Sequence, residues 1–312
     1  MSGRMRLGTR GSALALRQAG LVAAALERRG TTVELVRIRT SGDALAGSLA
    51  TAGGKGLFVK ELEEALLDGR IDVAVHSLKD MPASLPPGLL LVASPRREDA
   101  RDVLVSRAGV RLDDLPRGTR VGTSSLRRRA QLLARRPDLC VVDLRGNVDT
   151  RLKKLAAGEV DAVLLAAAGL NRLGLAPPGA VALAADEFVP AIGQGALALE
   201  ARAGDEAVHA VLRLLDDPVT AAAVAAERAF LAGVGGDCQT PLAAHATVAG
   251  ARVRVQGVVA EADGSGAVAA VAEGGTDAPE EAGTRLAAAL LARGAAGIIA
   301  RARQRATAQG GG

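Results

Sequence analysis

The most constraining feature of this chain is a regular alternation of short apolar runs with helical patterns over its first two thirds. Runs typical of β-strands occur at 5–9 and 33–40, and they flank an amphipathic helical pattern at 12–29 that ends at Gly30. Alternation of this kind indicates βαβ units, which place parallel strands in one sheet and helices on its faces. We therefore predict α/β domains in this part of the chain.

The same alternation continues downstream, and glycine or proline residues mark several of the predicted helix ends. It supports the prediction of more than one α/β domain, because a single sheet would not need so many elements. The further predicted helices are 59–68, 125–136 and 148–157, and the further predicted strands are 73–76, 140–144 and 162–165.

The last third of the chain has a different texture. A long helix is predicted at 218–231, followed by β-like runs at 252–259 and 267–272 and an alanine-rich helix at 276–291. Strands that follow one another without intervening helices are typical of α+β folds. We therefore predict a separate small α+β domain at this end.

The two α/β portions share an internal resemblance. The segment LLDGRIDVAV at 66–75 is echoed by LAAGEVDAVL at 155–164, which predicts the same helix, turn and strand twice. The first copy runs into HSLKD at 76–80, whereas the second runs into AAAGL at 166–170. Helix N-termini in both portions can bind anions, so we expect shared binding but chemistry concentrated in the first portion.

Composition narrows the classes of ligand. The net charge is +5, and only five of the 39 basic residues are lysines, so arginine, which binds carboxylates and phosphates bidentately, dominates. The chain has no Trp or Tyr and only three Phe, so it lacks the stacking platforms of single-strand nucleic-acid binders. Its two cysteines and three histidines do not have metal-ligand spacing, so no metal site is expected.

No segment indicates secretion or membrane insertion. Residues 1–10 lack the apolar core of a secretory signal, and no stretch reaches about 18 consecutive apolar residues. We therefore expect a cytoplasmic protein that spans no membrane.

An arginine-rich segment, VGTSSLRRR at 121–129, opens a predicted helix with three hydroxyl residues. Consecutive helical residues splay by about 100°, so the three arginines cannot all face one ligand. We expect Arg127 and Arg128 to face it and Arg129 to be solvated. By contrast, the GGKG at 53–56 lacks the spacing of a nucleotide phosphate loop, and the Gly-, Ala- and Ser-rich segment 41–56 is either a lid or an ordinary surface loop.

Five segments together resemble the hallmark segments of hydroxymethylbilane synthases, also called porphobilinogen deaminases. They occur in the family's order and span nearly the whole chain. The segments are GGKGLFVKE at 53–61, VHSLKDMP at 75–82, VGTSSLRR at 121–128, LRGNVDTR at 144–151 and AIGQG at 191–195.

The resemblance implies two α/β domains like type II periplasmic binding proteins and a C-terminal α+β domain. The implied boundaries are residues 1–95 with 190–215 for the catalytic domain, 96–189 for the anion-binding domain and 216–312 for the third. The third domain would carry a dipyrromethane cofactor on Cys238 through a covalent thioether.

The resemblance also implies the activity: a transferase of porphyrin biosynthesis that condenses four porphobilinogen molecules head to tail, releases ammonia at each step, and frees hydroxymethylbilane by hydrolysis. Asp80 would be the catalytic residue, because a carboxylate near the pyrrole N–H stabilises the positive charge that develops as ammonia leaves. The residues implied to hold the cofactor, besides Cys238, are Ser77, Lys79, Asp80, Thr123, Ser124, Ser125, Arg127, Arg128, Arg145 and Arg151, and those implied to bind substrate are Arg10, Ser12, Lys55, Phe58, Asn147, Arg172 and Gln194.

One residue departs from the family pattern. Asp237 stands beside Cys238 where family members commonly have glycine. A neighbouring carboxylate disfavours the thiolate, so we expect slower attachment of the cofactor. We expect Cys140 to be inert inside an apolar strand and His76 to order the catalytic segment, and we expect His209 and His245 to be structural.

Two alternatives stay open from the sequence. A nonenzymatic anion-binding module could use the same two-domain scaffold, but it would need neither Asp80 nor a cysteine in a third domain. A basic nucleic-acid binder is the other alternative. For the enzyme we expect porphobilinogen as the small-molecule partner, no nucleic acid or membrane, a monomer, and hand-over of the product to the next pathway enzyme.

Overall fold

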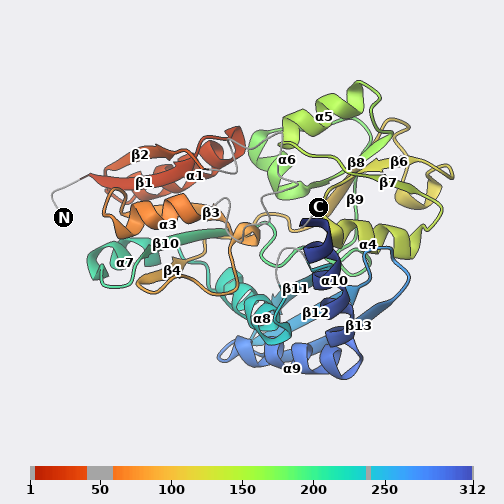
Figure 1. The fold of residues 1–312 in the computed structure, drawn as a ribbon. Coiled ribbons are helices and arrows are strands. Elements are labelled where there is room, and N and C mark those ends of the chain that lie inside the picture. Colours follow the sequence, from red (N-terminus) through yellow and green to blue (C-terminus); the bar gives the residue numbers. More distant parts are fainter. Residues whose placement is uncertain (1–3, 41–58, 237–239, 311–312) are drawn as a thin grey trace. The chain divides into compact units, whose positions relative to one another are not determined.

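The computed structural model describes residues 4–40, 59–236 and 240–310, shown as a ribbon in Figure 1. The chain divides into two compact units. The first unit consists of Met1–Glu98 with Gly195–Ala221, and the second unit consists of Asp99–Gln194 with Ala222–Gly312. The chain thus leaves the first unit after one long segment and returns to it for a short one.

The first unit contains a five-stranded sheet in the order β2-β1-β3-β10-β4. The strand β1 runs parallel to β2 and β3, whereas β10, from the returning segment, runs antiparallel to β3 and β4. The elements of this unit are β1 (Met5–Arg10), α1 (Ala13–Glu27), β2 (Val33–Ile38), α3 (Lys60–Leu67), β3 (Val73–Ser77), β4 (Leu89–Ala93), β10 (Leu197–Arg202) and α7 (Glu206–Arg213).

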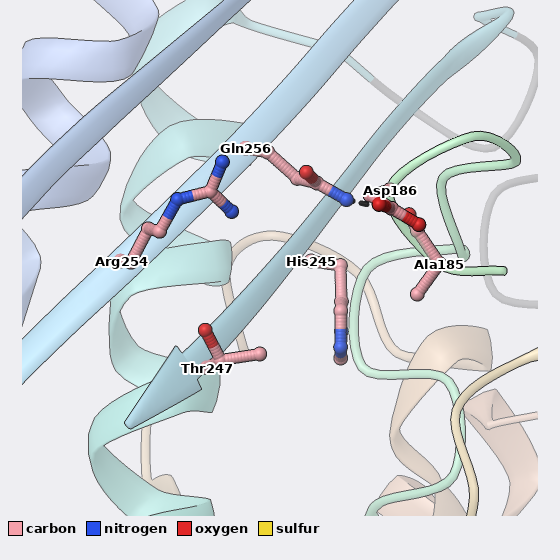
Figure 2. A pocket seen from close by; sticks show the side chains of 6 residues that line it. All are labelled: Ala185, Asp186, His245, Thr247, Arg254 and Gln256. Atoms are coloured by element: carbon pink, nitrogen blue, oxygen red, sulfur yellow. Dashed lines mark hydrogen bonds between the residues drawn. The ribbon is translucent and has the colours of Figure 1, made fainter. Parts of the chain in front are cut away.

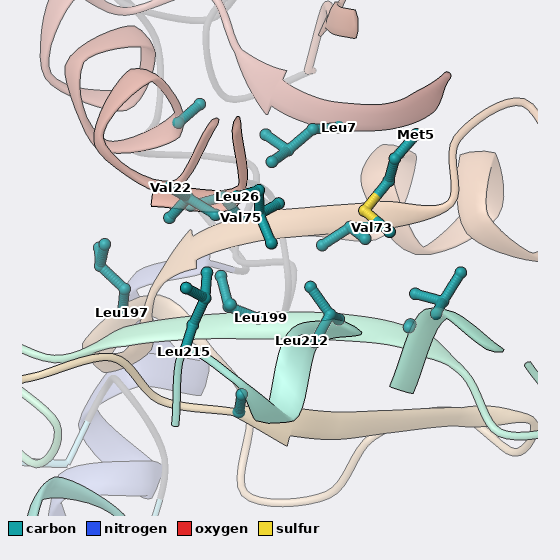
Figure 3. Close-up of a cluster of buried hydrophobic side chains, with 14 residues drawn as sticks. Met5, Leu7, Val22, Leu26, Val73, Val75, Leu197, Leu199, Leu212 and Leu215 are labelled. Carbon is teal, nitrogen blue, oxygen red and sulfur yellow. The ribbon is translucent and has the colours of Figure 1, made fainter. Parts of the chain in front are cut away.

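Helices cover both faces of this sheet. Val73 and Val75 of β3 belong to a buried cluster with residues of α1 and α7, whereas Ala74, between them, belongs to a second cluster with residues of α3. Alternate residues of a strand point to opposite faces, so the sheet lies between α1 with α7 on one side and α3 on the other. Figure 3 shows the first cluster, whose labelled members include Leu7, Leu26, Leu199 and Leu212.

The second unit contains a sheet with the same layout, in the order β7-β6-β8-β5-β9. Its strand β6 is parallel to β7 and β8, and β5 is antiparallel to β8 and β9. The elements are β5 (Asp102–Ser106), β6 (Arg120–Gly122), α4 (Leu126–Arg135), β7 (Cys140–Val142), α5 (Val148–Ala156), β8 (Ala162–Ala166), α6 (Ala167–Leu173) and β9 (Ala180–Ala182).

The internal resemblance corresponds to an equivalent ion pair in each sheet. Asp72 accepts hydrogen bonds from the backbone N–H of Arg6 at 2.8 Å and from its Nη2 at 2.7 Å. Asp161 accepts from the backbone N–H and the Nη2 of Arg120, both at 3.0 Å. Each aspartate precedes one strand and clamps the start of the neighbouring parallel strand, which fixes their register.

The turn before each of these aspartates depends on a glycine. Gly69 follows α3 with φ of 68°, and Gly158 follows α5 with φ of 76°. Glycine adopts these left-handed angles at little cost, and such residues commonly end helices. The repeated helix, turn and strand predicted from the sequence is therefore present in both sheets.

The second unit also holds a separate three-stranded antiparallel sheet in the order β11-β12-β13. Gly257 lies so close to Leu286 and Leu290 that an added Cβ would contact both, so α9 covers one face of this sheet. Together with the two α/β sheets, this part confirms the predicted fold class. Its elements are α8 (Pro218–Val234), β11 (Leu242–Ala249), β12 (Arg252–Ala260), β13 (Ala267–Gly275), α9 (Pro279–Ala292) and α10 (Ala295–Gly310).

The helices and strands predicted from the sequence are present within about three residues of their expected bounds. Two expectations about single side chains were wrong. Cys140 is exposed at the start of β7 rather than enclosed in an apolar strand. Arg129 is half-buried rather than solvated, because its Nη1 donates to the carbonyl of Val141 at 3.3 Å.

Among the described residues, no single helix has both the length and the hydropathy needed to cross a membrane. The helices α9 and α10 pass that test only as a pair, and they are bent by 82° at their break. The same residues contain no group of three or more His, Cys, Asp or Glu side chains arranged to hold a metal ion.

Candidate active site

Asp80 lies on a single turn of 3-10 helix, η1 (Leu78–Asp80), directly after β3. Leu78 is 1% exposed, and its backbone N–H donates to the carbonyl of Ala196 on the returning segment at 3.1 Å. Lys79 and Asp80 are exposed. One buried leucine thus anchors the turn, while the two charged residues after it face outward.

Ser77, the last residue of β3, is held by a residue that the sequence did not suggest. The buried side chain of Gln18 on α1 donates from Nε2 to Ser77 Oγ at 2.8 Å. The only sequence signal was a polar residue on the apolar face of a helix. Gln18 therefore fixes the side chain that immediately precedes the catalytic turn.

Three of the predicted binding residues are helix N-caps. Ser12, Ser125 and Asn147 begin α1, α4 and α5, and each accepts a hydrogen bond from the backbone N–H three residues on, at 3.3, 3.4 and 2.9 Å. Thr123 Oγ1 accepts from the backbone N–H of Ser125 at 3.2 Å, and Ser124 is exposed. Each cap satisfies one N–H of its first turn, and the other N–H groups there favour an anion.

Arg127 and Arg128 pair with a buried aspartate that the sequence analysis missed. Asp102 is 0% exposed, and it accepts from Arg127 Nη1 and from Arg128 Nη2, each at 2.7 Å. Arg127 Nη1 also donates to the carbonyl of Val189, and Arg128 Nη1 donates to that of Leu164, both at 2.8 Å. The two guanidinium groups are thus fixed within the second unit.

The charge of this group is strongly coupled. Burial alone would raise the pKa of Asp102, but Arg127 and Arg128 outweigh it and hold that pKa well below its usual range. Gln194, a predicted substrate-binding residue, donates from Nε2 to Asp102 Oδ1 at 3.1 Å and to the carbonyl of Ala100 at 2.7 Å. One carboxylate therefore faces two guanidinium groups, which leaves an excess of one positive charge.

Arg151 adds to that excess. It is half-buried on the first turn of α5, and its Nε donates to the carbonyl of Gly146 at 2.8 Å. Burial, followed by the nearby charge of Arg128, lowers the pKa of Arg151 to about 10. Among the described residues it has no ion-pair partner within 4 Å. Arg145 is exposed and pairs with Asp143 at 3.0 Å.

The remaining predicted residues are placed singly or not at all. Arg10 ends β1 and is half-buried, and Arg172 lies on α6 with 9% exposure. The others lie outside the described residues. These are Lys55, Phe58, Asp237 and Cys238.

These donors fit a cofactor that carries several carboxylates. A half-buried arginine with a lowered pKa is a costly arrangement unless an anion pairs with it. Arg151, next to two arginines that share one aspartate, is in that situation. The second unit therefore offers the charge that an acidic pyrrole chain needs.

A cavity of about 210 Å³ lies elsewhere in the second unit (Figure 2). Arg254 and Gln256 of β12 and His245 and Thr247 of β11 line it, and Gln256 Nε2 donates to the carbonyl of Ala185 across it. No residue predicted to bind cofactor or substrate belongs to its lining.

Solved structures with a loose likeness to the chain include periplasmic binding proteins. The methionine-binding protein MetQ is 15% identical with a TM-score of 0.43, covering 67% of this chain and 89% of its own. The aliphatic sulphonate binding protein SsuA from Escherichia coli is 17% identical with a TM-score of 0.39, covering 77% and 73%.

Sequence relatives give a much closer match. The porphobilinogen deaminase of Syntrophotalea carbinolica is 53% identical over 96% of each chain. That of Rubrobacter xylanophilus is 51% identical over 96% of this chain and 97% of its own. Residues 5–210 match the family described as "Porphobilinogen deaminase, dipyromethane cofactor binding domain", and residues 221–292 match the "Porphobilinogen deaminase, C-terminal domain". The chain belongs to the porphobilinogen deaminase family.

Proposed function

We propose that this chain is a hydroxymethylbilane synthase, which condenses four porphobilinogen molecules with release of ammonia and hydrolyses the product free. The observation that carries this conclusion is the family match, which extends over both α/β portions and the C-terminal domain. A nonenzymatic binding module has no comparable support.

Asp80 is the proposed catalytic residue. When bound, dipyrromethane supplies the pyrrole ring to which the first substrate is joined. The anchored turn presents the carboxylate of Asp80 outward, where it can lie beside the N–H of a substrate pyrrole. There it stabilises the positive charge that develops as ammonia leaves and accepts a proton as the new bond forms.

The arginines of the second unit are proposed to bind the acetate and propionate groups. Their geometry divides the work between them. Arg128 uses Nε, Nη1 and Nη2 in bonds within the protein, so it serves chiefly to fix Asp102 and the start of α4. Only Nε of Arg151 makes a described bond, so its two terminal nitrogens can bind a carboxylate bidentately.

Arg151→Leu is expected to weaken cofactor loading and substrate binding by about tenfold or more, because a charge-assisted hydrogen bond contributes roughly 1.5–3 kcal/mol. The same change is expected to leave the thermal midpoint unchanged or higher, because it removes a half-buried charge without a protein counter-ion. Loading measured by intact mass, KM for porphobilinogen and thermal unfolding check both parts.

Two further variants complete that comparison. Arg127→Leu and Arg145→Leu should also impair loading or elongation, whereas Arg135→Leu should not, because Arg135 pairs with the exposed carboxylates of Asp113 and Glu187. Equal effects at Arg151 and Arg135 would show that these arginines only contribute to a basic surface.

The enzyme itself is tested by incubating the purified protein with porphobilinogen. We expect four ammonia molecules for each tetrapyrrole released, measured by an ammonia assay and by mass spectrometry of the product. Binding of porphobilinogen without any ammonia would contradict the proposed function and support a binding module.

The remaining expectations are part of the same proposal. They are a thioether between Cys238 and the cofactor, action in the cytoplasm as a monomer, no nucleic-acid or membrane partner, and hand-over of an unstable linear product to the next pathway enzyme. Three domains with boundaries near residues 95, 190 and 215 also stay a prediction. The sequence change at the start of the C-terminal family match, residue 221, supports the last boundary.

A further inference from the structure

A group of titratable side chains lies buried behind the catalytic turn, on the face of the first unit's sheet that α3 covers. Ala74 of β3 packs against α3, and His76, two residues on, shares its face. Arg202 of β10 donates to the carbonyls of Leu66 and Ile71 at the end of α3, so Glu200, two residues earlier, also faces α3.

His76 and Glu200 form a fully buried pair. His76 Nε2 lies 2.9 Å from Glu200 Oε2, and their side chains are 2% and 0% exposed. The pair links two neighbouring antiparallel strands whose register places His76 opposite Ala198. Glu63 of α3 is also buried, at 8% exposure, and it is electrostatically coupled to both.

Two oxygens of this cluster lack a partner. Glu200 Oε1 and Glu63 Oε1 are buried and accept no hydrogen bond from any described residue. Two adjacent buried carboxylates with unpaired oxygens would carry a large desolvation cost and repel each other. A proton on Glu63 removes one charge and supplies an O–H that can donate to Glu200, so both oxygens are satisfied.

The electrostatics agree with this arrangement. Burial raises the pKa of Glu63, and the charge of Glu200 raises it further, whereas His76 opposes these effects. From the same helix, Glu64 raises it slightly. On β1, Arg10 stands two residues beyond Gly8, which pairs with Ala74, so it reaches the same edge of this face. Arg10 has bonds of its own and is not needed as a partner of the cluster.

We propose that Glu63 carries a proton that it shares with Glu200, and that the resulting Glu63–Glu200–His76 chain positions the turn that presents Asp80. His76 directly precedes Ser77 and η1, so a shift of its ring moves the start of the turn. Glu200 and Glu63 are positioning residues, since they reach the reaction only through His76. The positioning role rests on the proposed function of Asp80, whereas the shared proton does not.

The test compares three glutamine variants of the holoenzyme. Glu63→Gln keeps the shape and the donor of a protonated carboxyl, whereas Glu200→Gln removes the carboxylate that pairs with His76. Glu64→Gln, an exposed neighbour on α3 that pairs with Lys60, is the matched control. For each variant kcat and KM are measured across pH, together with the thermal midpoint and the fraction of folded protein.

Glu200→Gln is expected to lower kcat by about tenfold or more per folded molecule with KM changed by less than about twofold, because small misplacements of a catalytic group are costly. Glu63→Gln is expected to lose much less at neutral pH. Because folding raises the pKa of Glu63, the stabilisation from its proton is complete below the ordinary glutamate pKa and is lost as pH rises through the raised value. Glu63→Gln should abolish that fall in thermal midpoint, and Glu64→Gln should retain it.

Two results would overturn the proposal. If Glu63→Gln keeps the parent's pH dependence of the thermal midpoint, Glu63 does not hold the proton. If Glu200→Gln loses activity only in proportion to lost folded protein, the cluster does not position the turn. If the parent itself releases no ammonia, the proposed function fails, and the comparison of midpoints still decides whether the proton is shared.

Discussion

Asp80→Asn is expected to abolish turnover, with a loss of about a hundredfold or more, while the fold stays intact. The amide keeps the shape of the side chain but removes the negative charge that stabilises the departing-ammonia step. Asp80 is exposed on a turn held by the buried Leu78, and among the described residues its carboxylate forms no ion pair. The exchange should therefore cost little stability.

This prediction is checked by ammonia release and by thermal unfolding of the same preparation. Asp68→Asn is the matched control, since Asp68 is an exposed aspartate in the same unit whose partner is the neighbouring Arg70. A rate for Asp80→Asn near that of the control would remove Asp80 from the mechanism. A large fall in thermal midpoint would instead assign it a structural role.

Asp102→Asn is expected to have the largest effect on stability. Removing one partner from a buried ion pair costs roughly 3–5 kcal/mol, and here two guanidinium groups lose their counter-ion at once. Because Asp102 holds Arg127 and Arg128 in place, cofactor loading should fall as well. Urea unfolding and the intact mass after exposure to porphobilinogen measure the two effects.

The control for this change is Asp113→Asn, which breaks the exposed pair between Asp113 and Arg135. Surface pairs of this kind contribute at most about 1 kcal/mol. If the two variants unfold at the same urea concentration, the charge of Asp102 is not what secures the arginines. If Asp102→Asn unfolds early but loads the cofactor at the parent's rate, the arginines do not depend on it for their position.

Much of the fold could be predicted because its signals are local. The alternation of strands and helices, the glycine turns and the repeated segment each occupy a short window of sequence, and the predicted elements are present. The short strands β5 and β10 were missed, since both run antiparallel and interrupt the βαβ pattern. Asp102 and Glu200, which lie on these strands, were missed for the same reason.

The candidate site divides along the same line. Arg127, Arg128 and Arg151 stand in motifs that a sequence displays directly. Their partners do not, because pairing across the chain leaves no local pattern. Glu200 is 124 residues from His76, and Asp102 is 25 residues from Arg127. Only the sheet order brings these groups together, so the buried network beneath the site required the structure.

The intact mass of the purified protein tests the central claim most directly. We predict that the parent and Cys140→Ser carry an added mass equal to two linked pyrroles, since Cys140 is exposed but not the proposed attachment residue. Cys238→Ser should have the mass of the bare polypeptide. An unmodified parent that gains no mass after incubation with porphobilinogen, or an adduct that persists in Cys238→Ser, would contradict the proposed chemistry.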